Sequence, residues 1–182
     1  MEFLTHHRDR ADAGELRARL VERHWSFMDR YERQLIARGP TLDRLTGQAT
    51  GSVHLVELPS PRAARNFALD DPNYQAGVSR DVLVRRWQNL LGRTMWEFPG
   101  GEDGPHRYFV LGLAPAGDLD VSLPADTSEL IAYGPLLSDD GGTRLGVAAL
   151  VRAADPTSAR QLFGDQAYAT VEVHDWEFGG RP

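Results

Sequence analysis

The fold is decided by Gly51-Ser-Val-His-Leu-Val56, an apolar run that opens twelve residues after Gly39 of a Gly39-Pro40 pair. A second apolar run, Gly146-Val-Ala-Ala-Leu-Val151, opens at the same distance after Gly134 of Gly134-Pro135. The two occurrences of this pattern lie 95 residues apart in the chain. A fixed spacing between matching landmarks indicates an internal repeat, so we expect a duplicated unit.

A proline-marked helix start follows each apolar run. Ser60-Pro61 and Asp155-Pro156 both place a capping oxygen before a proline at the first helical position, and they are again 95 residues apart. The helix that begins at Pro61 is expected to run to about Leu69, where a polar turn stops it. The third shared landmark strengthens the case for duplication.

The expected elements describe an α+β protein. For residues 1–98 the hydrophobic spacing predicts strands at 2–7, 52–58 and 81–87 and helices at 15–38 and 61–69, with one further strand near 42–49 or beyond 87. For residues 106–182 it predicts strands at 108–113, 143–151 and 170–176, a shortened helix at 125–132 and a helix from 156. We interpret each half as a ferredoxin-like βαββαβ unit, fused and packing as an α+β barrel.

The turn-rich segment 99–105 is the expected linker between a unit at 1–98 and a degenerate unit at 106–182. Gly39-Pro40 is expected to end the long first helix, because glycine serves as a C-terminal cap and proline cannot continue a helix. In each unit the helices cover one face of the sheet, so the other face must be buried in another way. Two units in one chain can pack these uncovered faces against each other.

Composition excludes several classes of function. The chain of 182 residues has no cysteine, which rules out disulfides and thiolate chemistry. Its net charge of −6 argues against nucleic-acid binding. No apolar run is long enough to span a membrane, and the first residues do not form a secretory signal, so a cytoplasmic location is expected. Phosphate-binding loops and dinucleotide fingerprints are absent from the sequence.

The first half resembles the YCII-related family of the dimeric α+β barrel superfamily. The resemblance rests on His24, on Gly39-Pro40 with Asp43 shortly after it, on Gly51-Ser52, and on the run Asp71-Pro-Asn-Tyr-Gln-Ala-Gly-Val78. That last run is similar to the family's Asp-Pro-aromatic signature before the final strand. Residues 1 to about 90 carry the likeness well.

The resemblance implies a barrel of paired units and a His-Asp pair as catalytic apparatus. One family member removes HCl from a chlorinated hydroxyhydroquinone. On this basis His24 is the expected general base and Asp43 the carboxylate that orients its ring. A buried imidazole beside a carboxylate can titrate near neutral pH, as a general base requires.

Each of these roles has a simpler alternative. His24 falls on the apolar stripe of its helix, where a core histidine bonded to a backbone carbonyl is also common. Asp43 could be an ordinary turn residue. Asp71 is interpreted as part of a turn that stops the preceding helix.

Three further polar residues are candidate substrate-binding groups: His7, Arg8 and His54. Successive residues of a strand point to opposite faces, so at most one of His6 and His7 can join His54 in a pocket. A divalent metal held by these histidines with Asp43 is an alternative, but the spacing lacks a helical ligand motif, and no metal or cofactor is predicted. Arg8 could stabilise a developing oxyanion.

The sequence therefore predicts a small-molecule enzyme that performs cofactor-independent proton transfer, leading to elimination or isomerisation of an activated aromatic or enolisable substrate. The second half has Ser138 at the position of Asp43 and no histidine between His106 and His174, so one site per chain is expected. A non-catalytic binding or regulatory barrel is the main alternative, and a haem- or oxygen-using barrel enzyme is another. The sequence leaves open whether two chains form a homodimer.

Overall fold

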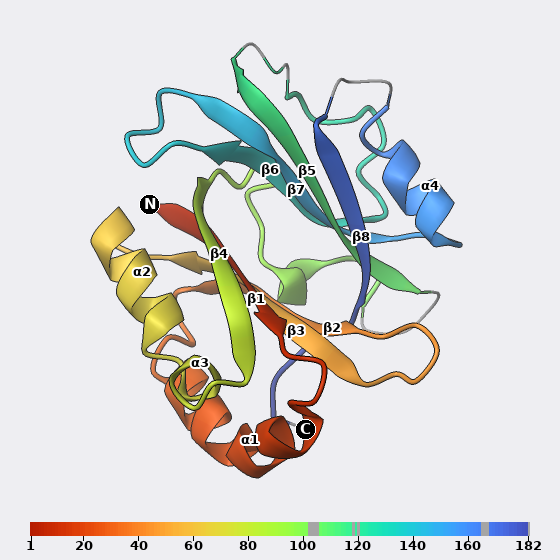
Figure 1. The fold of residues 1–182 in the computed structure, drawn as a ribbon. Coiled ribbons are helices and arrows are strands. Elements are labelled where there is room, and N and C mark those ends of the chain that lie inside the picture. The colour runs from red at the N-terminus through yellow and green to blue at the C-terminus, as the bar shows by residue number, and fades with distance from the viewer. Residues whose placement is uncertain (102–105, 118, 120, 165–167, 182) are drawn as a thin grey trace.

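Two four-stranded antiparallel sheets make up the protein (Figure 1). The structure is a computed structural model, and it describes residues 1–101, 106–117, 119, 121–164 and 168–181. The first half contains β1 (Glu2–Asp9), α1 (Gly14–Asp29), β2 (Leu35–Leu42), β3 (Ala49–Glu57), α2 (Pro61–Leu69), α3 (Pro72–Gln75) and β4 (Ser79–Trp87). After the short 3-10 helix η1 (Met95–Glu97), the second half contains β5 (Arg107–Gly117), β6 (Leu130–Leu137), β7 (Arg144–Arg152), α4 (Pro156–Gln161) and β8 (Thr170–Trp176).

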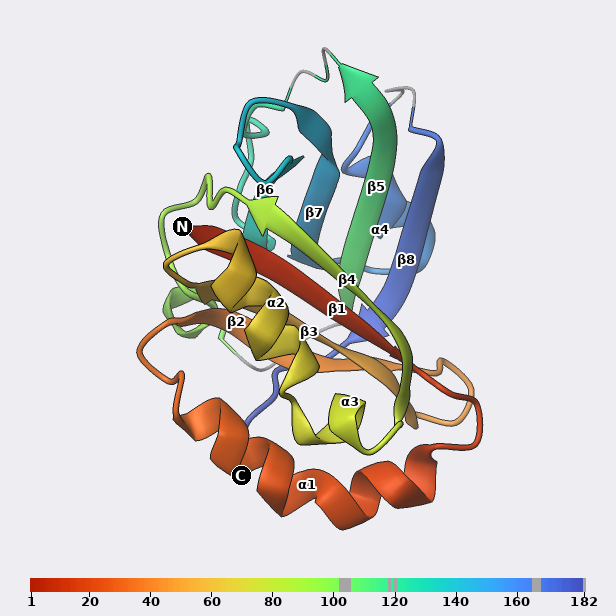
Figure 2. The ribbon, with the colours of Figure 1, turned by 60° about the vertical axis from the view of Figure 1, so that its left-hand side comes forward.

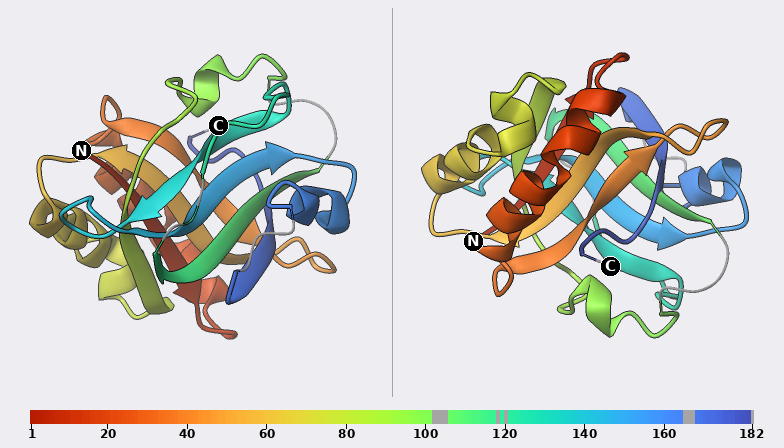
Figure 3. Two further views of the ribbon diagram at one scale, coloured as in Figure 1. Left: turned by 90° about the horizontal axis from the view of Figure 1, so that it is seen from above. Right: turned by 90° about the horizontal axis from the view of Figure 1, so that it is seen from below.

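The two sheets close into one ring of strands in the order β1-β3-β2-β8-β5-β7-β6-β4. Two short ladders join the halves, one between β2 and β8 and the other between β4 and β6. The views along the ring show each sheet facing the other across a shared interior (Figure 3). This closed arrangement confirms the predicted α+β barrel of two fused units.

Each junction between the halves uses a glycine of one half and a tryptophan of the other. Gly39 of β2 lies against the ring of Trp176, and a Cβ added to it would come within 2.8 Å of that ring. Gly134 of β6 lies against Trp87, whose Nε1 donates a hydrogen bond to the Gly134 carbonyl (3.1 Å). The two contacts are reciprocal, as in the isologous interface of a symmetric dimer.

Backbone hydrogen bonds repeat the same reciprocity. The amide of Glu177 donates to the carbonyl of Pro40 (3.3 Å), and the amide of Gln88 donates to the carbonyl of Pro135 (3.2 Å). In addition, β2 and β6 begin and end 95 residues apart, as do β3 and β7. The observed elements therefore keep the constant offset on which the proposed duplication rests.

Parts of two expected helices are strands in the structure. The helix α1 ends at Asp29 and not at Arg38, and the chain from Leu35 onward pairs with β3 as strand β2. In the second half, the expected helix at 125–132 is absent from the described residues, and Leu130 begins β6. The first error comes from interpreting Gly39-Pro40 as a helix end, although this pair, like Gly134-Pro135, lies inside a strand where a tryptophan of the other half approaches the backbone.

The protein has one shared core and separate outer layers. The interior of the ring is filled from both halves, including Leu4 and Val53 of the first half with Phe109 and Leu150 of the second. On the outer face of the first half, α1 and α2 cover an apolar cluster that includes Phe67. Figure 2 shows α1 running beneath the first sheet, beside α3. The surface between α1 and this sheet is where the candidate site lies.

None of the helices in the described residues is long and apolar enough to cross a membrane. Part of the expected linker 99–105, namely residues 102–105, lies outside the described residues. The boundary between units at 1–98 and 106–182 stays a prediction, although the element order agrees with a division in this region.

Candidate functional site

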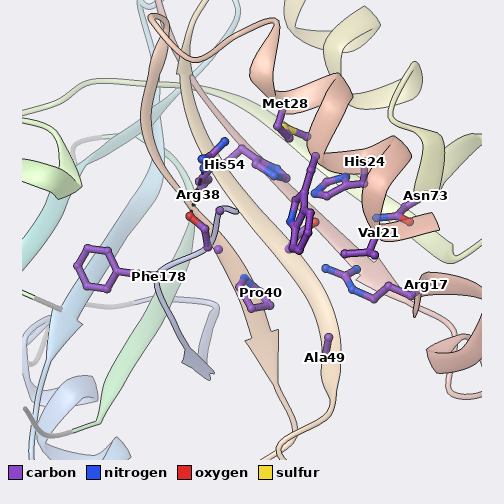
Figure 4. Close-up of a pocket in the computed structure, with 15 residues that line it drawn as sticks. Arg17, Val21, His24, Met28, Arg38, Pro40, Ala49, His54, Asn73 and Phe178 are labelled. Carbon is purple, nitrogen blue, oxygen red and sulfur yellow. Dashed lines mark hydrogen bonds between the residues drawn. The ribbon is translucent and has the colours of Figure 1, made fainter. Parts of the chain in front are cut away.

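A cavity of about 290 Å³ lies between α1 and the outer face of β2 and β3 (Figure 4). Side chains of α1, of the sheet, of the α3 region and of the C-terminal segment line it together. They are Arg17, Val21, His24, Trp25, Met28, Arg38, Gly39, Pro40, Ala49, Ser52, His54, Asn73, Phe178, Gly179 and Gly180. Its size is at the lower end of the range for small-molecule sites.

His24 projects from α1 into this cavity and forms a hydrogen bond with a buried carboxylate. Its Nδ1 lies 3.0 Å from Oδ1 of Asp71, and its side chain is 12% exposed, whereas that of Asp71 is 1% exposed. An ionised carboxylate can only accept, so Nδ1 carries the proton and donates it. Nε2 of His24 is then the nitrogen with a free lone pair, which is the arrangement of a general base held by an orienting carboxylate.

Asp71 also organises the local backbone. The same Oδ1 accepts a hydrogen bond from the amide of Asn73 (2.9 Å), so Asp71 is the N-cap of α3. Burial alone would raise the pKa of Asp71, but the hydrogen bond from His24 and the charge of His24 when protonated outweigh it and lower that pKa to about 2. Asp71 is therefore ionised at any pH near neutrality.

Two further histidines lie behind His24 in a buried row. The ring of His54 lies 5.8 Å from that of His24, and the ring of His7 lies 6.1 Å from that of His54. Nε2 of His7 donates to the carbonyl of Ala68 (2.8 Å). Burial, as the largest cause, lowers the pKa of both His7 and His54, which keeps both rings neutral. As strand alternation predicts, His6 is on the other face of β1 and faces the interior.

Cationic side chains complete the polar part of the wall. Arg17 donates to the carboxylate of Asp9 (2.8 Å), which holds its guanidinium at the edge of the cavity. Arg38 donates through Nε to the carbonyl of Gly179 (3.2 Å). Both arginines are placed where an anionic group of a ligand could interact with them.

The C-terminal segment of the second half forms one wall of this first-half cavity. Arg181 attaches it to α1, donating to Glu22 (2.8 Å) and Asp29 (3.1 Å) and lying over the ring of Trp25. The amide of Gly179 also donates to the carbonyl of Arg38. The site is thus built from both halves of the chain.

The structure does not bring two of the expected site residues to His24. Asp43 stabilises the turn between β2 and β3, where its Oδ1 accepts from the amides of Leu45 (3.1 Å) and Thr46 (2.8 Å). Arg8 lines a different cavity, inside the ring, and donates to Asp81 (2.7 Å). The predicted pairing of His24 with Asp43 is therefore replaced by its pairing with Asp71.

Sequence reasoning missed three groups of the site. Asp71 was interpreted only as a turn, although the Asp-Pro-aromatic resemblance already marked it. Arg17 and Arg38 were not singled out, because arginines at such spacing are common on solvated helix faces. No sequence signal could have placed Phe178 at this cavity, because its position depends on closure of the whole ring.

The chain is similar to one protein family and to several solved structures. Residues 1–88 match the YCII-related domain family. The structure is similar to the 5-chloro-2-hydroxyhydroquinone dehydrochlorinase of Burkholderia phenoliruptrix, solved with 2,5-dihydroxybenzoquinone, at 27% identity and a TM-score of 0.48, over 51% of this chain and 99% of that chain. No curated protein matches the sequence significantly.

A second solved structure resembles the whole chain. A mutant chlorite dismutase from Candidatus Nitrospira defluvii, in complex with cyanide, matches at 11% identity and a TM-score of 0.53, over 97% of this chain and 90% of that chain. This likeness concerns the fold of both halves together. At the level of sequence, the first half of the chain thus matches the YCII-related domain family over residues 1–88.

Proposed function

We propose that the protein is a YCII-type enzyme in which His24 acts as a general base on a small molecule and Asp71 orients and stabilises it. The observation that carries the proposal is the 3.0 Å contact between Nδ1 of His24 and Oδ1 of the buried Asp71, at the wall of a cavity. The match of residues 1–88 to the YCII-related domain family supports an enzyme-like role on a small molecule.

The chemistry follows from the free nitrogen of His24. Nε2 removes a proton from a carbon next to a carbonyl or on an activated ring, and the electron pair of that bond moves toward the oxygen. If the substrate carries a leaving group, the returning pair expels it and an elimination results. If it does not, protonation at another carbon gives an isomerisation. The imidazolium formed on His24 is stabilised by the ionised Asp71.

The surrounding residues suit an anionic or enolisable substrate. Arg38 and Arg17 provide positive charge for an oxygen that gains electron density. Trp25, Val21 and Met28 provide apolar surface for a ring or short carbon skeleton. The oxyanion role considered for Arg8 passes, in this proposal, to Arg38.

A non-catalytic binding barrel would be favoured by an apolar lining and by a His24 that bonds only to backbone. The observed partner of His24 is instead a carboxylate, and charged groups share the wall. Burial of Asp71 costs folding energy that a purely structural turn does not require. We therefore favour catalysis over binding alone.

Exchange of carbon-bound protons in D₂O tests the proposal without knowledge of the substrate. Chlorohydroquinone derivatives and simple β-keto acids serve as probes, with NMR for exchange and chloride release for elimination. We expect His24→Ala to lower the rate at least about 100-fold and Asp71→Asn to lower it about 100- to 10,000-fold. His106→Ala, at an exposed histidine of the second half, is the matched control and should leave the rate unchanged.

Thermal unfolding of each variant separates loss of chemistry from loss of fold. A His24→Ala variant that keeps both the stability and the exchange rate of the original protein would contradict the proposal. Binding of a probe with no exchange in any variant, over a panel of both probe classes, would favour the binding barrel instead.

A further inference from the structure

A second cluster of metal-binding residue types lies inside the ring, away from the cavity of His24. His6 projects inward from β1 of the first half, while Glu172 and His174 project inward from β8 of the second half. The last two are separated by one residue and so share one face of their strand. Each of the three offers a ligand atom, and these atoms all lie within 4.8 Å of one another. We refer to these three residues as the interior triad.

His6 is buried without a hydrogen-bond partner. It is 0% exposed, and neither of its ring nitrogens has a partner among the described residues. Its neighbours include the rings of Phe109 (4.9 Å) and His174 (5.1 Å), between centroids. An unsatisfied buried polar ring is costly, and such a group calls for a specific explanation. A ligand bound to the ring nitrogen would remove the cost.

The other two members already approach each other, and the site can be reached from outside. Nε2 of His174 lies 3.0 Å from Oε2 of Glu172. A cavity of about 400 Å³ opens beside His6 and His174, so an ion and its remaining water can enter.

Nearby charges are balanced by partners. Arg8 donates to Asp81 (2.7 Å) and more weakly to Oε1 of Glu172 (3.4 Å), while Oε2 is the oxygen that faces His174. Arg80 also pairs with Asp81 (3.1 Å). Asp9, Asp43, Asp175 and Arg44 line the same cavity, where Arg44 pairs with Asp175 (3.0 Å) and Asp9 pairs with Arg17 (2.8 Å). A divalent cation beside Oε2 therefore does not face an uncompensated positive charge.

We propose that the interior triad binds a divalent first-row transition-metal ion, with Zn²⁺ as the ion that suits it best. Two imidazoles and one carboxylate are a donor set for zinc and its neighbours, not for Mg²⁺ or Ca²⁺, which prefer oxygen ligands alone. Three protein ligands leave a fourth position for a group from the cavity. The ion would also connect β1 of one half with β8 of the other across the interior.

The histidines of the outer face are the competing location. There one nitrogen of His24 is bonded to Asp71 and one nitrogen of His7 to the carbonyl of Ala68, so each ring can offer only its other nitrogen. His6, in contrast, has both nitrogens available. The interior triad is the better site for this reason.

Metal titration of the full-length protein tests the proposal. The protein is treated with a chelator, dialysed, and titrated with Zn²⁺ by calorimetry and with Co²⁺ by visible absorption, which reports the ligand field. We expect one ion per chain. Glu172→Gln and His174→Gln should each weaken binding at least about 100-fold, as expected for loss of a direct ligand when an outer-shell partner alone costs 10- to 100-fold.

The controls distinguish the interior triad from other histidines. His106→Gln and His24→Ala should keep the affinity and the Co²⁺ spectrum of the original protein. Glu172 and His174 are partly exposed, so their variants are suitable even if a variant of the buried His6 fails to fold. Zn²⁺ should raise the melting temperature of the original protein and not that of His174→Gln. Absence of one-to-one binding, or binding that His24→Ala abolishes and His174→Gln preserves, would overturn the proposal.

Discussion

The outer faces of the two half-sheets carry different side chains at matching positions of the same ladder. In the first half, Thr5 of β1 is paired with His54 of β3. In the second half, the corresponding pair is Val110 of β5 with Ala149 of β7. The backbone register is the same in both, so the difference between a polar and an apolar outer face arises from side chains alone.

A second matching pair shows how the two faces are used. His7 is paired with Ser52 in the first half, and Gly112 with Val147 in the second. The second-half position has no side chain, and the ring of Tyr168 fills the space, 2.9 Å from where a Cβ would stand. One face thus forms a polar cavity beneath α1, whereas the other is sealed by packing. A sheet of this kind holds a site only where it carries polar groups and a helix covers them.

The largest effect on stability is expected from substituting the glycines at the two junctions between the halves. In Gly39→Ala the new Cβ would overlap the backbone oxygen of Glu177, and in Gly134→Ala that of Gln88. Because backbone must shift in both cases, we expect each variant to lose more than about 4 kcal/mol of unfolding free energy or to fail to fold. Urea unfolding measures this. Gly14→Ala, where a Cβ meets no atom within 4 Å, is the control and should be close to neutral.

A large cost at only one of the two glycines would mean that the junctions are not equivalent. In that case the two halves would be joined chiefly at one seam. The contacts at the two seams would then have similar geometry but contribute unequally to stability.

A smaller difference in unfolding free energy is expected between variants of the two junction tryptophans. Nε1 of Trp87 donates to Gly134, whereas Nε1 of Trp176 is buried with no partner among the described residues. Trp87→Phe and Trp176→Phe both remove a ring, but only the first removes a hydrogen bond. We expect Trp87→Phe to cost about 1 kcal/mol more than Trp176→Phe, measured by chemical unfolding. Equal costs would show that the hydrogen bond adds nothing at this seam.

The pH dependence of stability should come from the first half. Burial first, and then the charge of His24 when protonated, lower the pKa of His54. The unfolded chain therefore takes up the proton before the folded one, and the unfolding free energy falls as pH drops below about 6.5, by up to about 1.4 kcal/mol per pH unit from this residue. Urea unfolding between pH 7.5 and 5.5 measures the slope.

His54→Ala places the second-half residue at this position and should reduce that slope, to which the buried His6 and His7 also contribute, while lowering stability overall. His106→Ala, at an exposed site, should leave the slope as it is. A slope unchanged by His54→Ala would show that this ring is not held neutral by the fold.

The smallest effects on unfolding free energy are expected from the N-cap residues of α2 and α4, which occupy matching positions in the two halves. The hydroxyl of Ser60 accepts from the amide of Ala63 (3.2 Å), and the carboxylate of Asp155 accepts from the amide of Ser158 (2.7 Å). Ser60→Ala should cost about 1 kcal/mol at any pH. The cap at Asp155 should also stabilise, but only above the pKa of Asp155, which hydrogen bonds lower. Chemical unfolding at pH 7 and pH 3 distinguishes the two caps, and a Ser60→Ala loss that changes with pH would contradict this.

The sequence was sufficient to predict a helix or strand wherever neighbouring residues alone specify it. The helix at 61–69 and the strand at 170–176 were predicted with the observed bounds, because a cap, a proline and β-branched residues specify them locally. The strands β2 and β6 were mistaken because Gly39 and Gly134 are required by tryptophans far away in the chain. Local reasoning sees a helix end where the fold needs a close approach between halves.

The candidate site shows the same division. His24 could be identified from its place on an apolar stripe and from the family resemblance. Its partner could not be identified from sequence distance: Asp43 is nearer in the chain, but Asp71 is the carboxylate that α3 carries to the ring. Contacts between residues far apart in sequence depend on the path of the whole chain, and periodicity does not report that path.

The glycine and tryptophan contacts at the two seams have a consequence for how such a protein can change. When two identical subunits associate, each substitution is present in both of them. The two sides of the interface therefore cannot change independently of each other. A continuous polypeptide encodes the two sides separately, so the two halves can carry different side chains at matching positions of one ring.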